Sequence, residues 1–394
     1  MPSPLKILSV VGARPNFMKI APFAHAIERH NADDSQERDI EHVLLHTGQH
    51  YDAAMSQSFF ESLSIPPPDV NLEIGSGSHA EQIGRTMVAF ESYVRENRPD
   101  WIVVVGDVNA TCACAMVAAK ERIRLAHIEA GLRSFDLSMP EEINRIVTDR
   151  LSTLLLTPDA LADENLRKEG ADAARIRCVG NVMIDTLEAN REAASALDTG
   201  DILSASRLAE NAGDAPSLDN GFCLMTLHRP SNVDSQETLT SLVRCLIDDV
   251  AADLPLLWTI HPRTRERLEA FGLWAEICEC PRIELLNPLG YREMLKLNMH
   301  AALMLTDSGG LQEECCVVGT PCLTLRFNTE RPVTLSEHGG LCRLVGNDPE
   351  RIRPAFEEMH GQDRRPHSLP HSDGHAAERV VQAIIEADGL PSPY

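Results

Sequence analysis

Aromatic and basic residues are both scarce in this chain of 394 residues. Aromatics make up 4% of the sequence, whereas hydrophobic residues as a whole make up 43%, so we expect a largely aliphatic core. Lys and Arg number 36 against 59 Asp and Glu, which gives a net charge of −23. An excess of negative charge repels the phosphates of nucleic acids and the headgroups of anionic membranes. The composition therefore argues against both as partners.

Long apolar runs and metal-type cysteine spacings are also missing. No run approaches the ~20 apolar residues that a membrane-spanning helix needs, and the first residues, MPSPLKILSVVGARPNF, lack the apolar length of a signal peptide. The eleven cysteines include close pairs, but none has the two-residue gap of a zinc clip. Most lie in apolar runs, where a thiol behaves as a small hydrophobic group. We expect reduced thiols, no metal and a cytoplasmic location.

What the sequence does contain is a regular alternation of short and long segments. The short segments are apolar and rich in β-formers: Leu5–Val11, Val43–Thr47, Trp101–Val105, Leu125–Ile128, Phe222–Leu227, Leu256–Ile260, Ala302–Thr306 and Cys322–Leu325. The longer ones have helical periodicity, as in Ala80–Glu96, Glu141–Ser152 and Gln236–Val250. Such alternation predicts parallel sheets with helices on both faces.

The expected strands form two groups, which a polar stretch separates. This stretch, Glu188–Asn220, is rich in Ala, Asp and Ser and is typical of a hinge helix followed by a loose connector. We therefore predict an α/β protein with two Rossmann-like, doubly wound domains that face each other across a cleft. The N-terminal domain covers residues 1–184 and the C-terminal domain residues 185–375. A last helix within 376–394 is expected to pack back on the first domain.

Polar residues follow nearly every predicted strand. The clusters are Gly12–Asn16, Thr47–His50, Gly106–Asp107, Glu129, Thr226–Arg229, His261–Arg263 and Asp307–Gly310. Ligands of doubly wound sheets bind at the carboxyl ends of the strands. The clustering therefore predicts an active site at these ends, in the cleft between the domains.

Two of these clusters suggest anion binding. Backbone N–H groups at Ser308-Gly309-Gly310 could hold a phosphate at a helix N-terminus, although a tight turn with Ser308 as N-cap explains the residues equally well. One turn later, Glu314 could accept hydrogen bonds from a ribose diol or could simply favour a helix start. Arg14 and Lys19 follow the first strand, where they could bind a pyrophosphate or lie on the surface as ordinary cations.

The other clusters suggest proton transfer. Asp107 and Glu129 follow apolar strands, and burial in a cleft raises carboxyl pKa values towards neutrality. His228 and His261 could act likewise, and the alternative for all four is a hydrogen-bonded polar group at a sheet edge.

Two further segments have mainly structural explanations. Ser138-Met-Pro-Glu141 fits a capping box, and Glu141 and Arg145 fit an i, i+4 ion pair. A catalytic role for Glu141 needs support from outside this pattern. Gly75-Ser-Gly77-Ser-His-Ala80 matches the dinucleotide pattern G-x-G-x-x-G/A only weakly, because no full first strand precedes it. We interpret it as a loop before a helix and do not predict NAD.

Eight longer segments appear in a characteristic order. They are GARPNFMK (12–19), GDVNAT (106–111), HIEAGLRSFDLSMPEEINR (127–145), GNVMIDTL (180–187), TLHRPSNVD (226–234), HPRT (261–264), TDSGGLQEE (306–314) and NTERPVT (328–334). The series resembles the non-hydrolysing UDP-N-acetylglucosamine 2-epimerases over nearly the whole chain. This resemblance implies a GT-B fold, a homodimer and a UDP-sugar substrate, with no redox cofactor.

The resemblance also implies roles for individual residues. Pyrophosphate would bind at Ser308, Gly309 and Gly310 with help from Arg14, His228 and Arg331, while Glu314 would bind the ribose and His261 would join the substrate-binding group. Asp107, Glu129, Glu141 and His228 would be catalytic, and Lys19 and Arg145 would support them. Family members are thought to eliminate UDP, which leaves 2-acetamidoglucal, and then to add UDP back. Which carboxylate is acid and which is base stays open.

Some positions depart from the family pattern. Relatives with substrate activation at a second site have two glutamines where this chain has Gln49 and Asp52, so we predict weak or absent activation. Met294 and Gly339-Gly340-Leu341 also differ from the more usual residues, which leaves the exact sugar open. The alternatives are a hydrolysing epimerase and a 2-epimerase of another UDP-2-acetamido sugar, such as UDP-2,3-diacetamido-glucuronic acid.

Two further alternatives belong to other functional classes. A GT-B glycosyltransferase would not need the proton-transfer residues Glu129 and Glu141. A silent UDP-sugar sensor would not need to retain the carboxylates.

Overall fold

A computed structural model of the chain describes residues 3–48, 66–367 and 369–389, which divide into two compact units. The first unit runs to Ala189 and includes the residues from Pro370 onward, and the second is Asn190–Leu369. In the described residues each unit is built on one parallel sheet. The predicted α/β class with two parallel sheets is therefore confirmed.

The sheet of the first unit has the strand order β3-β2-β1-β4-β5-β6-β7 in the described part of the chain. Its strands are β1 (Leu5–Val11), β2 (Ile40–His46), β3 (Val70–Asn71), β4 (Trp101–Val105), β5 (Arg124–Ile128), β6 (Leu154–Thr157) and β7 (Ile176–Cys178). The central strands are runs of β-branched and aliphatic residues, and β4 is buried along its whole length. Strands buried on both faces are typical of a sheet that helices cover on each side. The order 3-2-1-4-5-6 is that of a Rossmann-type sheet.

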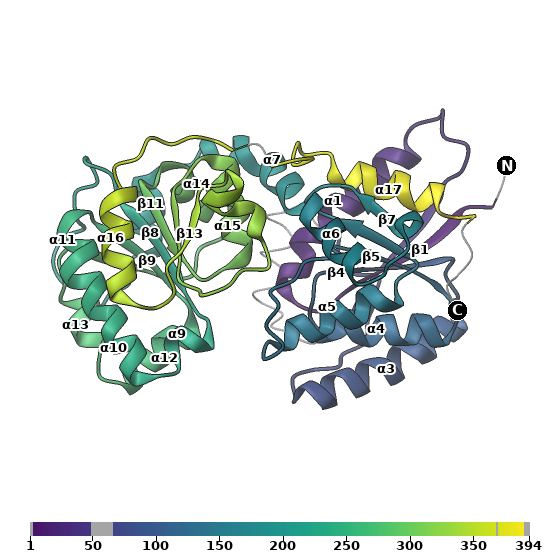
Figure 1. Cartoon of the computed structure of the whole chain (residues 1–394), viewed down its shortest axis with the longest axis horizontal. Coiled ribbons are helices and arrows are strands. Elements are labelled where there is room, and N and C mark those ends of the chain that lie inside the picture. The colour runs from purple at the N-terminus through teal and green to yellow at the C-terminus, as the bar shows by residue number, and fades with distance from the viewer. Residues whose placement is uncertain (1–2, 49–65, 368, 390–394) are drawn as a thin grey trace. The chain divides into compact units, whose positions relative to one another are not determined.

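Helices cover both faces of this sheet (Figure 1). They are α1 (Arg14–Asn31), α3 (His79–Glu96), α4 (Asn109–Lys120), α5 (Pro140–Leu151), α6 (Ala160–Lys168), α7 (Val182–Ser195), α17 (Ala376–Glu386) and the 3₁₀ turn η1 (Ala173–Arg175). Figure 1 shows α1 and α17 above the sheet and α3, α4 and α5 below it. The last helix, α17, packs against α1, and the carboxylate of Asp185 accepts hydrogen bonds from the first two amides of α17 at 3.0 and 2.7 Å. A carboxylate at a helix N-terminus also stabilises the helix dipole.

The described sheet of the second unit has the order β10-β9-β8-β11-β12-β13. Its strands are β8 (Cys223–Leu227), β9 (Leu256–Ile260), β10 (Ile283–Leu286), β11 (Leu303–Thr306), β12 (Cys322–Thr324) and β13 (Cys342–Leu344). The helical segments are α8 (Thr199–Ser206), α9 (Pro230–Val233), α10 (Gln236–Cys245), α11 (Ala251–Asp253), α12 (Pro262–Ala270), α13 (Trp274–Cys278), α14 (Tyr291–His300), α15 (Gly309–Val318), α16 (Pro349–Met359), the π-turn η2 (Leu246–Val250), and the 3₁₀ turns η3 (Pro332–Thr334) and η4 (Ser336–His338).

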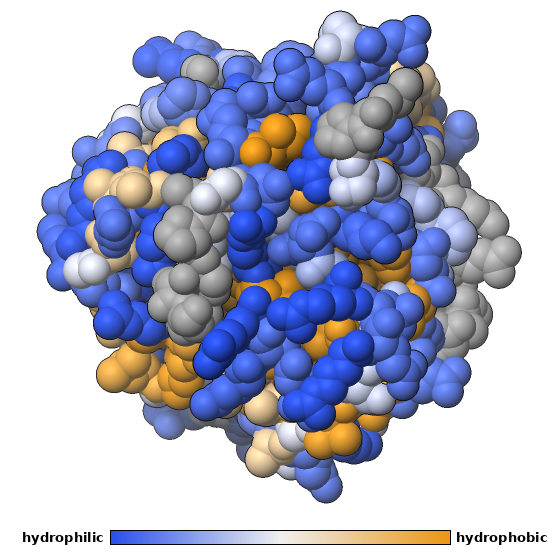
Figure 2. All heavy atoms as spheres, turned by 90° about the vertical axis from the view of Figure 1, so that its right-hand side faces the viewer, coloured by the Kyte–Doolittle hydropathy of each residue, from blue (hydrophilic) through white to orange (hydrophobic). Residues whose placement is uncertain are grey.

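The core is mainly Leu, Ile, Val and Ala, with a few fully buried aromatic residues such as Trp101, Trp258, Phe23 and Phe90, so the predicted aliphatic core is confirmed. All eleven cysteines are free thiols, and nine of them are buried. Hydrophilic side chains cover most of the face shown in Figure 2, with separate hydrophobic groups between them. None of the helices in the described ranges is both long enough and apolar enough to cross a membrane.

One detail of the sequence prediction is wrong. The stretch after Glu188 is not only one helix and a connector, because α7 continues to Ser195 and α8 follows it. The predicted helical segment Gln236–Val250 is confirmed over its whole length, as α10 followed by the π-turn η2 from Leu246. Five strands were also not predicted, namely β3, β6, β7, β10 and β13.

Candidate functional site

The predicted residues of the first unit gather at the carboxyl ends of β1, β4 and β5. Lys19, on α1, forms a buried ion pair with Glu129, which follows β5. Gly106 follows β4 and lies beside this pair, since a Cβ atom added to it would be 3.1 Å from Lys19 Nζ and 3.5 Å from Glu129 Oε2. Its φ of +68° also favours glycine. The structure thus brings Lys19, Glu129 and the turn before Asp107 into one group.

Glu129 itself has an unusual backbone conformation. Its φ is +70°, in the left-handed region that non-glycine residues rarely adopt. Such a conformation costs on the order of 1–3 kcal/mol and persists where the surrounding structure imposes it. The strain at Glu129 marks this strand end as a constrained position with a charged side chain.

Asp107 belongs to a second charged group beside the first. The buried guanidinium of Arg145, on α5, pairs with both Asp107 and Glu142. Glu142 is buried and also accepts hydrogen bonds from the amides of Ser134 and Phe135 at 3.0 and 2.9 Å. Burial raises the pKa of Glu142, but the Ser134 amide and Arg145 outweigh it and hold that pKa below its usual value. Asp107 is 30% exposed, so its carboxylate can reach a ligand while Glu142 cannot.

The predicted surroundings of Glu141 need correction. The helix α5 begins at Pro140 with Met139 as N-cap, so the capping box at Ser138 is wrong, and the Ser138 hydroxyl instead donates to Asp136 at 2.6 Å. Within α5, Arg145 pairs with Glu142, three residues before it, where the sequence favoured Glu141, four residues before it. Glu141 is partly exposed in the first turn of the helix. Sequence reasoning thus missed the role of Glu142.

In the second unit, Asp307 organises the ends of β8 and β11. It is fully buried and accepts hydrogen bonds from the amides of His228 and Arg229 at 3.0 and 2.7 Å and from Asn232 Nδ2 at 3.0 Å. His228 Nδ1 lies 2.9 Å from Asp307 Oδ1. Burial raises the pKa of Asp307, but these partners, led by His228, lower it below its usual value. Asp307 therefore stays charged and fixes the orientation of the His228 ring.

His228 and His261 lie side by side, with ring centroids 5.4 Å apart. The His228 side chain is 37% exposed. His261 accepts a hydrogen bond from the Arg263 amide at 3.2 Å and so caps α12. Burial and the neighbouring His228 lower the pKa of His261, which favours its neutral form. The structure brings these two predicted histidines together at one sheet edge.

Ser308, Gly309 and Gly310 form the N-terminus of α15, which is where the predicted phosphate site requires them. Ser308 is the N-cap, but its side chain makes no capping hydrogen bond. Gly309 leaves space for two charged side chains, because a Cβ atom there would lie 2.5 Å from Glu330 Oε1 and 3.0 Å from Arg331 Nη1. The free amides of the first turn and the helix dipole favour an anion at this position.

Arg331 lies within a buried network of alternating charges. It pairs with Glu313 at 2.6 Å and with Glu330 at 2.8 Å, and Glu330 pairs with Arg326 at 2.7 Å. Burial raises the pKa of Glu330, but Arg331 and Arg326 outweigh it and hold that pKa far below its usual value. Arg326 is 6% exposed, and its Nη1 has no hydrogen-bond partner among the described residues. Sequence reasoning missed Arg326, which precedes the NTERPVT segment.

Glu314, predicted to bind a ribose, is buried in α15. Burial, together with the neighbouring Glu313, raises its pKa to about 8 against the opposing effect of a hydrogen bond with Tyr291. The group is therefore largely protonated at neutral pH. Its role in ribose binding stays a prediction.

Some predicted features lie outside the described structure or apart from these groups. Arg14 opens α1, but its side chain is not described, and Gln49 and Asp52 fall outside the described residues. The second-site prediction therefore stays a prediction. The loop before α3 is confirmed, since Ser78 caps that helix and forms a capping box with Glu81.

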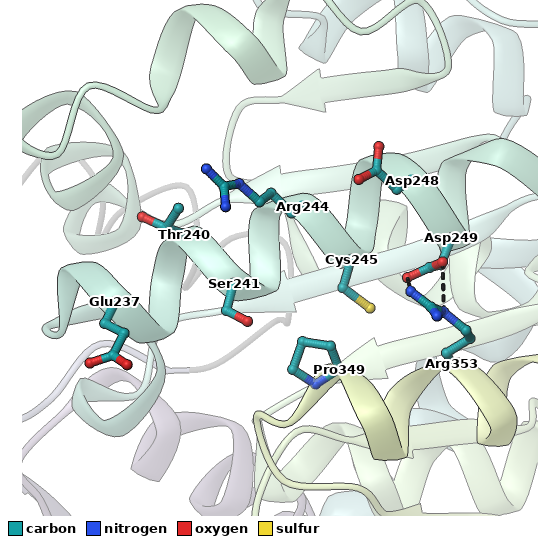
Figure 3. Close-up of a pocket in the computed structure, with 9 residues that line it drawn as sticks. All are labelled: Glu237, Thr240, Ser241, Arg244, Cys245, Asp248, Asp249, Pro349 and Arg353. Carbon is teal, nitrogen blue, oxygen red and sulfur yellow. Dashed lines mark hydrogen bonds and ion pairs between the residues drawn. The ribbon is translucent and has the colours of Figure 1, made fainter.

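A groove of about 430 Å³ lies beside α10 and α16, away from the predicted residues (Figure 3). Its lining residues are Glu237, Thr240, Ser241, Arg244, Cys245, Asp248, Asp249, Pro349 and Arg353. Asp249 and Arg353 already neutralise each other at 2.7 Å. Across the described ranges, no cluster of three or more His, Cys, Asp or Glu side chains could hold a metal ion.

Comparisons with known proteins show the family to which the chain belongs. The sequence model of a family described as UDP-N-acetylglucosamine 2-epimerase matches residues 33–385. A UDP-N-acetylglucosamine 2-epimerase of Methanocaldococcus jannaschii is 38% identical over 96% of this chain and 99% of its own length. A UDP-2,3-diacetamido-2,3-dideoxy-D-glucuronate 2-epimerase of Pseudomonas aeruginosa is 40% identical over 97% of this chain and 100% of its own.

The fold is also shared with a solved structure. The crystal structure of the M. jannaschii UDP-GlcNAc 2-epimerase in complex with UDP-GlcNAc and UDP has a TM-score of 0.83 to this chain at 37% identity, covering 97% of this chain and 100% of that one.

Proposed function

Because the chain belongs to the UDP-N-acetylglucosamine 2-epimerase family, we propose that it interconverts UDP-N-acetylglucosamine and UDP-N-acetylmannosamine. Its two Rossmann-like sheets are those of the family's GT-B-like fold. The observation that carries the proposal is the group at the edge of the first sheet, where Asp107 and Glu129 each pair with a buried cation. Such a pair of carboxylates suits the removal and return of one proton.

The chemistry must invert carbon 2, whose hydrogen is not acidic. In the proposed path the bond between carbon 1 and the UDP oxygen breaks, and UDP leaves with the bonding electrons. The proton on carbon 2 passes to a protein base, and 2-acetamidoglucal remains. In the return step a proton adds to carbon 2 from the opposite face and the UDP oxygen attacks carbon 1. No electrons leave the substrate, so the path needs no redox cofactor.

In this proposal the first unit supplies the proton-transfer residues. Asp107 and Glu129 are the main candidates, with Lys19 and Arg145 as their fixed counter-charges. Glu141, on the first turn of α5, is a third candidate. A cation close to a carboxylate favours its charged form, which a base requires.

The second unit would bind UDP at the N-terminus of α15. Arg326, Arg331, Glu313 and Glu330 sum to zero charge when all four are ionised, so the network alone does not attract an anion. The attraction for a pyrophosphate would come from the amides of Gly309 and Gly310 in the first turn of α15, together with Ser308 at the N-cap and His228. Arg331 would supply directed hydrogen-bond donors, and Arg14, His261 and Glu314 would complete the set of substrate-binding residues.

The non-hydrolysing type can be tested by proton NMR of the purified protein with UDP-N-acetylglucosamine in heavy water. A growing manno anomeric signal, with deuterium at carbon 2 of both UDP-sugars, is the expected result. Free N-acetylmannosamine with UDP would show the hydrolysing type instead.

The same assay addresses the second candidate substrate, a UDP-2,3-diacetamido-uronic acid. The 40% identity to the P. aeruginosa 2-epimerase that is named for such a sugar supports it. It becomes the better candidate if the protein binds UDP but leaves UDP-N-acetylglucosamine unchanged.

The cytoplasm, where sugar nucleotides and reduced thiols occur together, is the proposed location.

A homodimer is also part of the proposal. The first unit has large exposed apolar side chains on and around α3 and α5, both of which pack against α4: Val88, Phe135, Leu137, Ile143 and Ile146. Exposed apolar side chains of this kind favour burial against a second copy of the chain. Ile143→Lys should shift the mass measured by light scattering from dimer to monomer, and a monomeric wild type would refute the proposal.

A further inference from the structure

His127, in the middle of the first sheet, has a contact on each ring nitrogen. It is fully buried in β5. Nδ1 lies 2.6 Å from Asp149 Oδ1, and Nε2 lies 2.9 Å from the carbonyl oxygen of Gly106. A carboxylate and a carbonyl oxygen only accept hydrogen bonds. Each ring nitrogen of His127 thus faces a hydrogen-bond acceptor, and the two contacts hold the ring between Asp149 and Gly106.

The partner of His127 is itself held firmly. Asp149, on α5, is 3% exposed, pairs with Arg133 at 2.7 Å and accepts a hydrogen bond from the Gly131 amide at 3.0 Å. Burial raises the pKa of Asp149, but His127 and Arg133 outweigh it and hold that pKa below its usual value. A charged carboxylate with three bonding partners fixes the plane and the position of the imidazole ring.

The other contact of His127 lies next to a predicted catalytic residue. Gly106 directly precedes Asp107, and its φ of +68° makes the turn that leads out of β4. On the other side of Asp107, Asn144 Nδ2 donates to the Asp107 carbonyl at 2.9 Å. The two peptide units that flank Asp107 are thus each bound by a buried side chain. The direction in which the Asp107 carboxylate points depends on both.

We propose that His127 is a positioning residue for Asp107, which it controls through the carbonyl group of Gly106. The inference rests on the proposed function, because it concerns the rate of a reaction in which Asp107 moves a proton. His127 does not touch substrate, since it is fully buried beneath the turn. A misplacement of about 1 Å at a reacting group can lower a rate by about 10²-fold.

Two substitutions separate the two contacts of the ring. The amide nitrogen of Asn occupies nearly the place of Nδ1, so His127→Asn retains the contact to Asp149 and loses the one to Gly106. The amide nitrogen of Gln occupies nearly the place of Nε2, so His127→Gln retains the contact to Gly106 and loses the one to Asp149.

If His127 positions Asp107, His127→Asn lowers kcat by about 10²-fold and His127→Gln lowers it by less than about 10-fold. KM and UDP affinity should change by less than about 2-fold in both variants. The opposite order, or equal losses at equal Tm, would overturn the proposal, because a purely structural role through Asp149 favours the Asn variant. If His127→Asn does not fold, a loss above about 10²-fold in a stable His127→Gln would overturn it alone.

His42→Asn is the matched control. His42 lies in β2 of the same sheet, and its Nε2 is 2.8 Å from Ser9 Oγ. Through Ile7 of β1 it is in register with Trp101 at the start of β4, whereas the Gly106 turn follows the other end of β4. It should lose stability to a similar extent without a change in kcat.

Hydrogen exchange keeps this inference separate from the proposed function. In His127→Asn, amide exchange in peptides that cover Gly106 and Asp107 should rise, while peptides of α15 stay unchanged. Unchanged exchange at Gly106 and Asp107 would overturn the positioning role even if the wild type epimerises. If the wild type shows no epimerisation, the proposed function fails, and the exchange data still decide whether His127 holds the turn.

Discussion

The strands of the two sheets end in charged groups of different kinds. The carboxyl ends of the strands in the first unit are called the first edge, and those in the second unit are called the second edge. At the first edge Asp107 and Glu129 each have a close cation, and Asp107 keeps part of its surface exposed. At the second edge the charges form a buried neutral network of Arg326, Glu330, Arg331 and Glu313 behind a helix N-terminus. Both edges come from the same type of parallel sheet, so the difference lies in the residues that follow the strands.

This difference matches the two tasks that we propose for these residues. A proton-transfer group needs a small number of charged side chains with a fixed direction, which the left-handed backbone at Gly106 and Glu129 provides. An anion site needs N–H donors and little competing negative charge, which a glycine-rich helix start with neutralised carboxylates provides. Substitutions at the first edge should therefore change kcat, and those at the second should change affinity for UDP.

The largest effect is expected for Asp107→Asn. The amide cannot accept the substrate proton, so turnover should fall by on the order of 10²–10⁴-fold, while UDP affinity stays within about 2-fold. Steady-state kinetics and UDP titration calorimetry measure the two quantities. Asp33→Asn, at an exposed turn, is the control and should leave both unchanged. Unchanged turnover in Asp107→Asn would refute its catalytic role.

Gly309→Ala tests the second edge in the same way. The added methyl group would lie 2.5 Å from Glu330 Oε1, so the network must move away from the start of α15. We expect UDP affinity to fall by about 10- to 100-fold, which is about 1.4 to 2.7 kcal/mol at 25 °C. Gly84→Ala is the control, because no atom lies within 4 Å of its added Cβ. Equal affinities of the two variants would show that UDP does not use this helix start.

The sequence predicts that charged groups lie at both edges, but it does not predict which side chains pair with one another there. Apolar runs followed by polar residues locate the ends of β1, β4, β5, β8 and β11, because a parallel sheet buries its strands and exposes their ends. The missed edge strands β3, β7 and β13 have only two or three residues each, and their exposed or half-buried positions interrupt the apolar run that identified β12, which is equally short but fully buried.

Individual residues show more clearly which side-chain partners the sequence does not reveal. Glu141 and Glu142 are adjacent in the sequence, and both lie one helical turn before Arg145, so their spacing alone does not decide which of them pairs with it. Glu142 is the one that the Ser134 amide also holds, and this contact comes from a loop outside the helix. The helix starts at Pro140 and not after a Ser138 cap. His127 lies within an apolar strand, and its partner Asp149 is 22 residues away, so no local pattern connects them.

A smaller effect is expected for Glu314→Gln, which should change how the stability of the folded chain depends on pH. The pKa of Glu314 is raised to about 8 in the folded chain, so the folded state binds more protons than the unfolded state above its ordinary value near 4.5. The contribution of this group to stability is therefore present at pH 4 and is lost as the pH rises towards 8. The Gln variant has no charge to desolvate.

The Tm of Glu314→Gln should rise relative to the wild type between pH 5 and pH 8. Glu164→Gln, at an exposed position on α6, is the control and should show no such trend. A constant difference across this pH range would contradict the raised pKa. A loss of UDP affinity in Glu314→Gln would add support for ribose binding at this carboxyl group.

The smallest effect is expected for Arg326→Lys, which weakens the contact to Glu330 at the second edge without removing a charge. Lysine lacks the planar fork that holds Glu330 at 2.7 Å, so Glu330 and then Arg331 gain freedom beside Gly309. KM should rise by about 3- to 10-fold, while kcat changes little, if the residue acts only through the network that we propose to bind UDP. Arg343→Lys is the control, since its ion pair with Glu358 lies on the surface of β13. A fall in kcat without a change in KM would place Arg326 with the proton-transfer residues and would remove the division of tasks between the two edges.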